Sequence, residues 1–233
     1  MTLKNQLIEV KKILVITPHT DDELFGVGGT LLKLKEEGHD IKICLMSCSD
    51  RYLHHLNRII TEEEQWSEFL NVCKHISTEE PLKFNTDNVR LEEIPQYKIV
   101  RWLDAVIKEY QPNIIYTCEP SYHQEHKDVF NATISACRPT YGKNRIEEVL
   151  LYESPTSIWS DPNEKFIPNI YVDIEPYIKK KIKIFQDCYK IQHTDKERLN
   201  LSEKGLIKHA NYRGYESNLT FAESFRLIRK VIL

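Results

Sequence analysis

The sequence has no long hydrophobic run, and this absence excludes the membrane-spanning proteins. Nowhere in its 233 residues does an apolar stretch approach the roughly 20 residues that a helix needs to cross a bilayer. The first 12 residues are polar and lack the apolar core of a signal peptide. We therefore expect a protein with no membrane span.

The sequence also lacks paired cysteines. None of its six cysteines shows C-x-x-C spacing, and several lie in apolar stretches, where a free thiol behaves as a small hydrophobe. Structural thiols in a reduced, cytoplasmic compartment are the simplest interpretation.

A strong excess of charge of one sign is missing as well. The chain has 32 Lys and Arg against 35 Asp and Glu, a formal net charge of -3. The basic run 179–181 is typical of a solvated helix face, so we expect no nucleic-acid partner. No repeat, low-complexity tract or shift in composition divides the chain. This predicts a single domain over residues 1–233, with a homo-oligomer left open.

What the sequence does contain is a β-α-β pattern near its N-terminus. A buried strand is predicted over 12–17, a helix over 22–37 and a second strand over 41–46, with Gly38 in the turn between the last two. A return this tight is typical of parallel strands joined by a right-handed crossover. We therefore expect an α/β fold with a parallel sheet.

Further elements follow along the chain. A capping box at Thr61 and Glu64 predicts the start of a helix. The other expectations are helices over 96–110, 129–136, 175–190 and 196–211, strands over 82–84, 113–118 and 148–152, loops over 50–60 and 153–170, and a final helix from about Phe221.

The most informative motif is Pro18-His19-Thr20-Asp21-Asp22-Glu23, which directly follows the first strand. It lies in a strand-to-helix turn at the carboxyl end of a strand, where open α/β sheets place their ligand crevice. Adjacent carboxylates at Asp21 and Asp22 point in different directions, so one can bind a metal while the other faces the substrate. The turn predicts a metal site with a spare carboxylate for proton transfer.

A second motif, Ser121–Asp128, follows the strand predicted over 113–118 and contains His123 and His126. If that strand neighbours the first, the two motifs meet across the crevice. Catalytic zinc commonly takes three protein ligands from His and carboxylate and leaves a position for water. The residues alone therefore predict metal-assisted hydrolysis.

These two motifs resemble the signature motifs of the PIG-L/LmbE-like family of zinc-dependent de-N-acetylases. The family's first motif is usually (P/A)HPDDE, and its second ends in Asp-His. Two other stretches also match the family, Gly28-Gly29-Thr30 and the closing Ala222–Phe225 element after Arg213-Gly214. The resemblance implies a Rossmann-like three-layer sandwich with a mostly parallel central sheet.

The resemblance also implies an activity and its residues. The activity is removal of an N-acetyl group from an N-acetylglucosamine-type sugar or its conjugate, a small-molecule amino-sugar substrate. His19, Asp22 and His126 would bind Zn²⁺, although Fe²⁺ or another divalent ion suits the same donors. Asp21 would be the general base, and His123 would stabilise the oxyanion.

The chain departs from the family pattern at two positions. Thr20 stands where Pro is usual, and Glu125 replaces the usual Asp before the second metal-binding histidine. A carboxylate there could orient His123 or His126 from outside the metal's own ligands. Glu125 is also a candidate substrate contact.

Three further residues are candidate substrate contacts. Asp50 and Arg51 follow the second strand and would rim the crevice. They could contact sugar hydroxyls or an anionic group there, or form an ordinary salt bridge within the loop. Trp159 could stack on a sugar face or pin its own loop to the body of the protein.

Other functions remain open at this point. The glycines at 26, 28 and 29 invite a nucleotide-binding interpretation, but the acidic turn before them would repel a pyrophosphate, so close helix–sheet packing is favoured. A thiol-conjugate amidase would use the same metal site. A non-catalytic Rossmann-like binding protein with a degenerate site is the alternative outside the enzymes.

Overall fold

The computed structural model describes residues 9–84, 90–139, 146–154, 165–194 and 198–232. Its centre is a seven-stranded sheet in the order β5-β2-β1-β6-β7-β9-β8. The strands are β1 (Lys12–Thr17), β2 (Asp40–Leu45), β5 (Leu82–Lys83), β6 (Ile114–Cys118), β7 (Glu148–Tyr152), β8 (Ile170–Asp173) and β9 (Ala222–Lys230). The five strands β5, β2, β1, β6 and β7 run parallel to one another, and β9 is antiparallel to both of its neighbours, β7 and β8.

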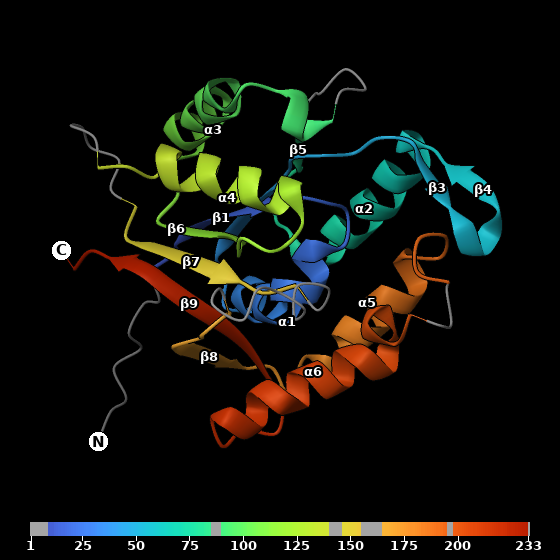
Figure 1. Ribbon diagram of the computed structural model, residues 1–233. Coiled ribbons are helices and arrows are strands. Elements are labelled where there is room, and N and C mark those ends of the chain that lie inside the picture. The colour runs from blue at the N-terminus through green and yellow to red at the C-terminus, as the bar shows by residue number, and fades with distance from the viewer. Residues whose placement is uncertain (1–8, 85–89, 140–145, 155–164, 195–197, 233) are drawn as a thin grey trace.

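Helices cover both faces of this sheet (Figure 1). They are α1 (Asp22–Glu36), α2 (Glu62–Ile76), α3 (Gln96–Tyr110), α4 (Gln124–Ala136), α5 (Ile178–Cys188) and α6 (Glu203–Glu216). Helices α3 and α4 pack together on one face, while α1, α2, α5 and α6 lie on the other. The expected three-layer α/β sandwich with a mostly parallel sheet is confirmed.

Strand β1 occupies the middle of the parallel region. Residues 13–16 are completely buried, with β2 on one side and β6 on the other. Since β1 and β6 are neighbours and parallel, the turns that follow them lie at the same edge of the sheet. This arrangement sets the two histidine motifs side by side.

Glycines in α1 allow the helix to approach the sheet closely. A Cβ on Gly26 would lie 2.2 Å from Cδ2 of Tyr152 in β7, and a Cβ on Gly29 would lie 2.9 Å from Cγ2 of Ile174. A real side chain at Gly26 would overlap the ring, so α1 could not pack where it does. The packing role predicted for these glycines is confirmed.

Two sequence predictions are wrong. The stretch 50–60, expected to be a loop, forms a hairpin of β3 (Arg51–Leu53) and β4 (Arg58–Ile60) with a 3₁₀ turn between them. The final element is strand β9 rather than a helix, because its residues pair with β7 and β8, which are distant in sequence.

Other boundaries need only adjustment. Helix α4 begins five residues before its predicted start, β8 was not foreseen, and the capping box at Thr61 is present as predicted. In the described part of the chain, no helix has the length and apolar character that crossing a membrane requires.

Candidate metal centre

The first motif lies in the turn between β1 and α1, and its backbone is unusual. Asp21, at the N-cap of α1, has a φ of 148°, which residues with a Cβ rarely adopt. Glu23 supports this conformation, since its carboxylate accepts hydrogen bonds from the Asp21 amide at 3.0 Å and the Tyr189 hydroxyl at 2.5 Å. Burial raises the pKa of Glu23 to about 8. These hydrogen bonds to Glu23 stabilise the backbone of the turn.

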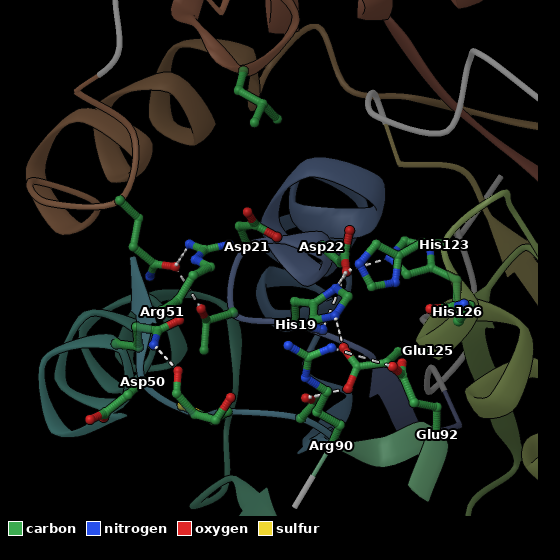
Figure 2. Close-up of a pocket in the computed structure, with 18 of the residues that line it drawn as sticks. His19, Asp21, Asp22, Asp50, Arg51, Arg90, Glu92, His123, Glu125 and His126 are labelled. Carbon is green, nitrogen blue, oxygen red and sulfur yellow. Dashed lines mark hydrogen bonds and ion pairs between the residues drawn. The ribbon is translucent and has the colours of Figure 1, made fainter. Parts of the chain in front are cut away.

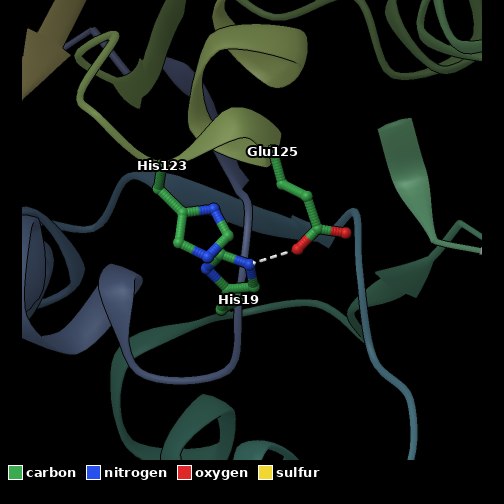
Figure 3. Close-up of side chains that lie close together, drawn as sticks. All are labelled: His19, His123 and Glu125. Carbon is green, nitrogen blue, oxygen red and sulfur yellow. Dashed lines mark hydrogen bonds and ion pairs between the residues drawn. The ribbon is translucent and has the colours of Figure 1, made fainter. Parts of the chain in front are cut away.

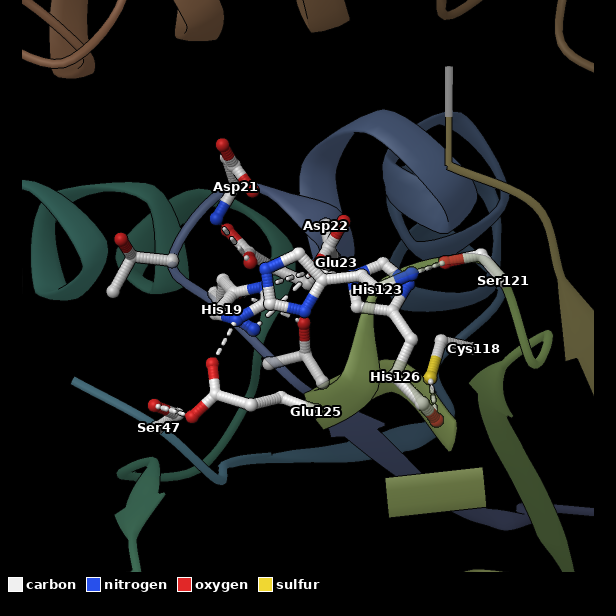
Figure 4. A network of polar contacts seen from close by, with 12 residues as sticks. His19, Asp21, Asp22, Glu23, Ser47, Cys118, Ser121, His123, Glu125 and His126 are labelled. Carbon is white, nitrogen blue, oxygen red and sulfur yellow. Dashed lines mark hydrogen bonds and ion pairs between the residues drawn. The ribbon is translucent and has the colours of Figure 1, made fainter. Parts of the chain in front are cut away.

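The second motif begins where β6 ends. His123 is the N-cap of α4, and His126 lies in the first turn of that helix, almost fully buried. Figure 4 shows both histidines facing His19 and Asp22 across the edge of the sheet. The structure therefore brings together residues more than 100 positions apart in the sequence.

Three donor atoms converge where the motifs meet. Oδ2 of Asp22 lies 3.3 Å from Nδ1 of His19 and 3.2 Å from Nε2 of His126, and the three side chains form a set able to hold a metal ion. Burial disfavours the charge on Asp22, but His126 and His19 outweigh it and hold the pKa of Asp22 well below its usual range. Among the described residues, no lysine or arginine pairs with Asp22.

These distances fit a tetrahedral ion. Zinc binds nitrogen and carboxylate oxygen at about 2.0–2.2 Å, so two donors on one tetrahedral ion lie about 3.4 Å apart. A second set, His19, His123 and Glu125, also brings its donor atoms within 4.8 Å of one another. The first set is the better candidate because, as described next, Glu125 already has other partners.

Glu125 lies outside the first set and holds His19 in place. One of its oxygens lies 2.7 Å from Nε2 of His19 (dashed line in Figure 3), and the other accepts hydrogen bonds from Ser47 Oγ and the Leu91 amide. Burial opposes its charge, but the hydrogen bond with His19 prevails and lowers the pKa of Glu125 to about 2. Carboxylates commonly orient metal-binding histidines in this way.

Glu125 contacts a different histidine from the two that the sequence analysis named. The carboxylate was expected to orient His123 or His126, but it reaches His19 on the other motif. The same contacts keep His19 charged when no metal is bound. Burial opposes that charge, yet Asp22 and Glu125 together raise the pKa of His19 to about 10.

Asp21 points away from this set, toward a residue that the sequence analysis missed. Its Oδ2 lies 3.0 Å from Nε2 of His193. His193 follows α5, and its ring packs against Phe25, Phe185 and Tyr189. It belongs to no motif, so no sequence signal marked it. Asp21 and Asp22 therefore point in different directions, as expected of adjacent carboxylates.

His123 is more exposed than the other two histidines and faces the pocket. Its ring centroid lies 4.6 Å from that of His19 and 5.2 Å from that of His126. Burial, together with the nearby His19 and His126, lowers the pKa of His123 to about 4. At neutral pH its ring is therefore uncharged, with one N–H to donate.

A cavity of about 460 Å³ opens over these groups (Figure 2). It is lined by both motifs and by Asp50, Arg51 and Glu125, three of the four predicted substrate contacts. One Asp50 oxygen accepts a hydrogen bond from the Glu62 amide at the start of α2. Trp159, the fourth, lies outside the described residues. Arg90, Arg198 and Gln192 also line the cavity and were not predicted.

Fold and geometry together define a doubly wound α/β protein with a candidate His/carboxylate metal centre at the carboxyl edge of its parallel strands. A model of the PIG-L family, GlcNAc-PI de-N-acetylase, matches residues 14–137, more than half of the chain. The chain belongs to this family of deacetylases.

Individual relatives agree with this assignment. The chain is 27% identical to the diacetylchitobiose deacetylase of Thermococcus kodakarensis, over 97% of this chain and 86% of that protein. The N,N'-diacetylchitobiose deacetylase of Pyrococcus horikoshii, solved with an inhibitor, superposes with a TM-score of 0.72 at 20% identity, over 98% of this chain and 87% of that one.

The fold alone does not determine the reaction. The 4-carboxy-2-hydroxymuconate hydratase GalB from Pseudomonas putida KT2440 superposes with a TM-score of 0.71 at 18% identity, over 96% of this chain and 98% of that one. A hydratase and deacetylases therefore share this architecture, and the reaction must be argued from the site.

Proposed function

We propose that this chain is a metal-dependent hydrolase that removes the acetyl group from the nitrogen of an N-acetylglucosamine-type sugar or its conjugate. The convergence of His19, Asp22 and His126 at the spacing of a tetrahedral ion carries the proposal. Membership in a deacetylase family and the likeness to a diacetylchitobiose deacetylase support the choice of substrate.

The three converging residues would hold the ion, Zn²⁺ or another divalent ion such as Fe²⁺. When bound, such an ion polarises a carbonyl and lowers the pKa of water to about 7. Glu125 keeps His19 turned toward the site by its contact with Nε2. Asp22 links the two motifs, since its Oδ2 is near both histidines.

Asp21 would transfer the protons of the reaction, and His123 would stabilise the negative charge that develops. The carboxylate of Asp21 would accept the proton of the attacking water and deliver it to the leaving amine. The uncharged ring of His123 would donate a hydrogen bond to the developing oxyanion. The two side chains approach the cavity from different motifs, so they can act on opposite sides of the same amide.

Seven of the described strands form one continuous sheet, and we extend the proposal to a single domain over residues 1–233. A small amino sugar is the proposed partner. The cytoplasmic location stays a prediction.

The experiment uses N,N'-diacetylchitobiose as the probe. We expect release of free amine and acetate, loss of that release after chelation, and its return with added Zn²⁺ or Fe²⁺. His54→Ala, in the exposed hairpin turn outside the cavity, is the control and should match the wild type. Chelated protein that hydrolyses the probe at an undiminished rate would contradict the proposal.

A further inference from the structure

We propose that His193 is a positioning residue, which holds the carboxylate of Asp21 in the direction that a general base in the cavity requires. The inference rests on the proposed function, because that function makes Asp21 the base. Its basis is the segment that follows α5, residues 189–194, which returns to the turn between β1 and α1.

Asp21 and His193 form a pair at the wall of the cavity. Oδ2 of Asp21 lies 3.0 Å from Nε2 of His193, and both residues line the cavity. The side chain of His193 is 3% exposed, whereas that of Asp21 is 14% exposed. The imidazole therefore contacts the carboxylate from the protein interior, and the carboxylate stays accessible from the cavity.

Three aromatic rings fix the plane of the imidazole. Its centroid lies 5.1 Å from that of Phe25, 5.4 Å from that of Tyr189 and 5.6 Å from that of Phe185. The rings of Phe25 and Tyr189 meet it at 70° and 86°, the edge-to-face geometry that aromatic pairs favour. His193 cannot turn away from Asp21 without losing these contacts.

The backbone before His193 is anchored independently of Asp21. The carboxylate of Glu68 in α2 is buried and accepts hydrogen bonds from the amides of Ile191 at 2.7 Å and Gln192 at 3.4 Å. Two amide donors on one buried carboxylate hold this stretch of backbone against α2. The ring of His193 can therefore act as a fixed support for the carboxylate of Asp21.

The same segment also holds the backbone of Asp21. The Tyr189 hydroxyl donates to one oxygen of Glu23 at 2.5 Å, and the other oxygen accepts from the Asp21 amide at 3.0 Å. A residue with a φ of 148° keeps this conformation only where its surroundings enforce it, and such conformations cluster at functional sites. The segment after α5 thus restrains Asp21 at both its main chain and its side chain.

The ring nitrogen that faces Asp21 restricts the carboxylate further. Nε2 of His193 is buried and makes no aligned hydrogen bond within the described residues, although Oδ2 of Asp21 is 3.0 Å away. A buried polar group without a hydrogen bond is unfavourable. Rotation of the carboxylate toward Nε2 is therefore stabilised, and rotation away from it is not.

The competing explanation is that His193 only fills space among the three aromatic rings. Two substitutions separate the explanations. His193→Phe keeps an aromatic ring for packing and removes the nitrogen, whereas His193→Gln loses the ring and places an amide N–H near the position of Nε2. Space filling predicts the higher activity for His193→Phe, and positioning predicts it for His193→Gln.

Steady-state kinetics on zinc-loaded protein, with N,N'-diacetylchitobiose as the probe, compare the two variants. We expect His193→Phe to lower kcat about 100-fold, because a misdirected base is poorly placed for proton transfer. KM and zinc content should stay at wild-type values, and His193→Gln should recover most of the lost kcat. His75→Gln, which changes an exposed histidine of α2 outside the cavity, is the control and should match the wild type.

A double-mutant cycle tests whether His193 acts through Asp21. In the Asp21→Asn background there is no base to direct, so His193→Phe should lower the residual kcat by less than about twofold. Effects that multiply, or a His193→Phe variant as active as the wild type, would overturn the inference. A raised KM in His193→Phe would overturn it as well, because it would mark a direct contact with the substrate.

A readout without turnover separates this inference from the proposed function. The ring nitrogens of His193, observed by long-range ¹H–¹⁵N NMR on zinc-loaded protein, should shift in Asp21→Asn. They should not shift in Asp50→Asn, which changes another carboxylate that lines the cavity. Resonances that do not respond to Asp21→Asn overturn the inference even if the probe is deacetylated. Protein that shows the shift but deacetylates no probe supports the pairing of His193 with Asp21 and counts against the deacetylase.

Discussion

Two histidine–carboxylate clusters in this chain use the same residue types in different ways. At the candidate metal centre, His19, Asp22 and His126 lie against the cavity. In a second cluster, which we call the Glu153 cluster, Glu153 contacts His209 and Arg213. Glu153 is buried and takes part in that pairing.

The difference lies in the counter-charge. Arg213 donates to both oxygens of Glu153, and the Ser224 hydroxyl adds a further hydrogen bond. Within the described ranges, the side-chain partners of Asp22 are instead histidine ring nitrogens, which can bind a metal when deprotonated. A carboxylate matched by an arginine stabilises the fold, whereas one matched by histidines alone is suited to a cation.

The largest expected effect is on turnover. Asp21→Asn removes the proposed base but none of the three candidate ligands, so kcat should fall about 10³-fold while metal content is unchanged. Steady-state kinetics and elemental analysis on the same preparation check this. A variant that loses activity and metal together would place Asp21 among the ligands instead.

The next effect is on the stability of the fold. It tests whether the Glu153 cluster and the candidate metal centre are independent of each other. Glu153→Gln should lower the free energy of unfolding by about 3 kcal/mol, because buried Arg213 loses the carboxylate that accepts from two of its nitrogens and keeps only Glu216 as an acidic partner within the described ranges. Metal content should not change. Denaturant unfolding measures the first quantity, and loss of metal from a folded variant would show that the clusters are coupled.

The same cluster predicts a pH dependence. Burial opposes the charge of Glu153, but His209 and Arg213 outweigh it and lower its pKa from 4.5 to about 2. Its contribution to stability is therefore full above about pH 4.5 and is lost as the pH falls toward 2. The stability gap between wild type and Glu153→Gln should narrow over this range. A gap independent of pH between 5 and 2 would contradict the pairing.

A smaller effect is expected from the residue that holds His19. Glu125→Gln should weaken metal binding about 10- to 100-fold, because its contact with His19 Nε2 is weakened. Competition with a chelating dye gives the affinity. Glu92→Gln, also at the cavity but in contact with Arg90, is the matched control and should bind metal as the wild type does.

The sequence predicted the parallel half of the fold better than the rest, for a physical reason. Strand β1 and helix α1 are specified by local apolar patterns, and their motif follows at once. The segment from Phe221, which includes β9, has apolar residues at Phe221 and Phe225, a spacing that suggests a helix. Pairing with β7 and β8 decides its structure, and local pattern does not show that pairing.

The candidate site also contains residues that the sequence could predict and residues that it could not. His19, Asp22 and His126 stand in motifs, so the sequence could single them out before any geometry was available. His193 and Gln192 carry no motif, and they reach the site only because the chain after α5 returns to the first turn. Such contacts depend on tertiary packing that a single sequence does not reveal.

The central claim is that two distant motifs form one metal centre, and metal content tests it most directly. Protein purified without added metal should contain about one equivalent of zinc or iron per chain, and His126→Ala should lose it, with Ala substituted at His209 in the Glu153 cluster as the matched control that retains it. Wild-type protein that holds no metal and takes up no added zinc, or a His126→Ala variant that binds metal as tightly as the wild type, would contradict the claim.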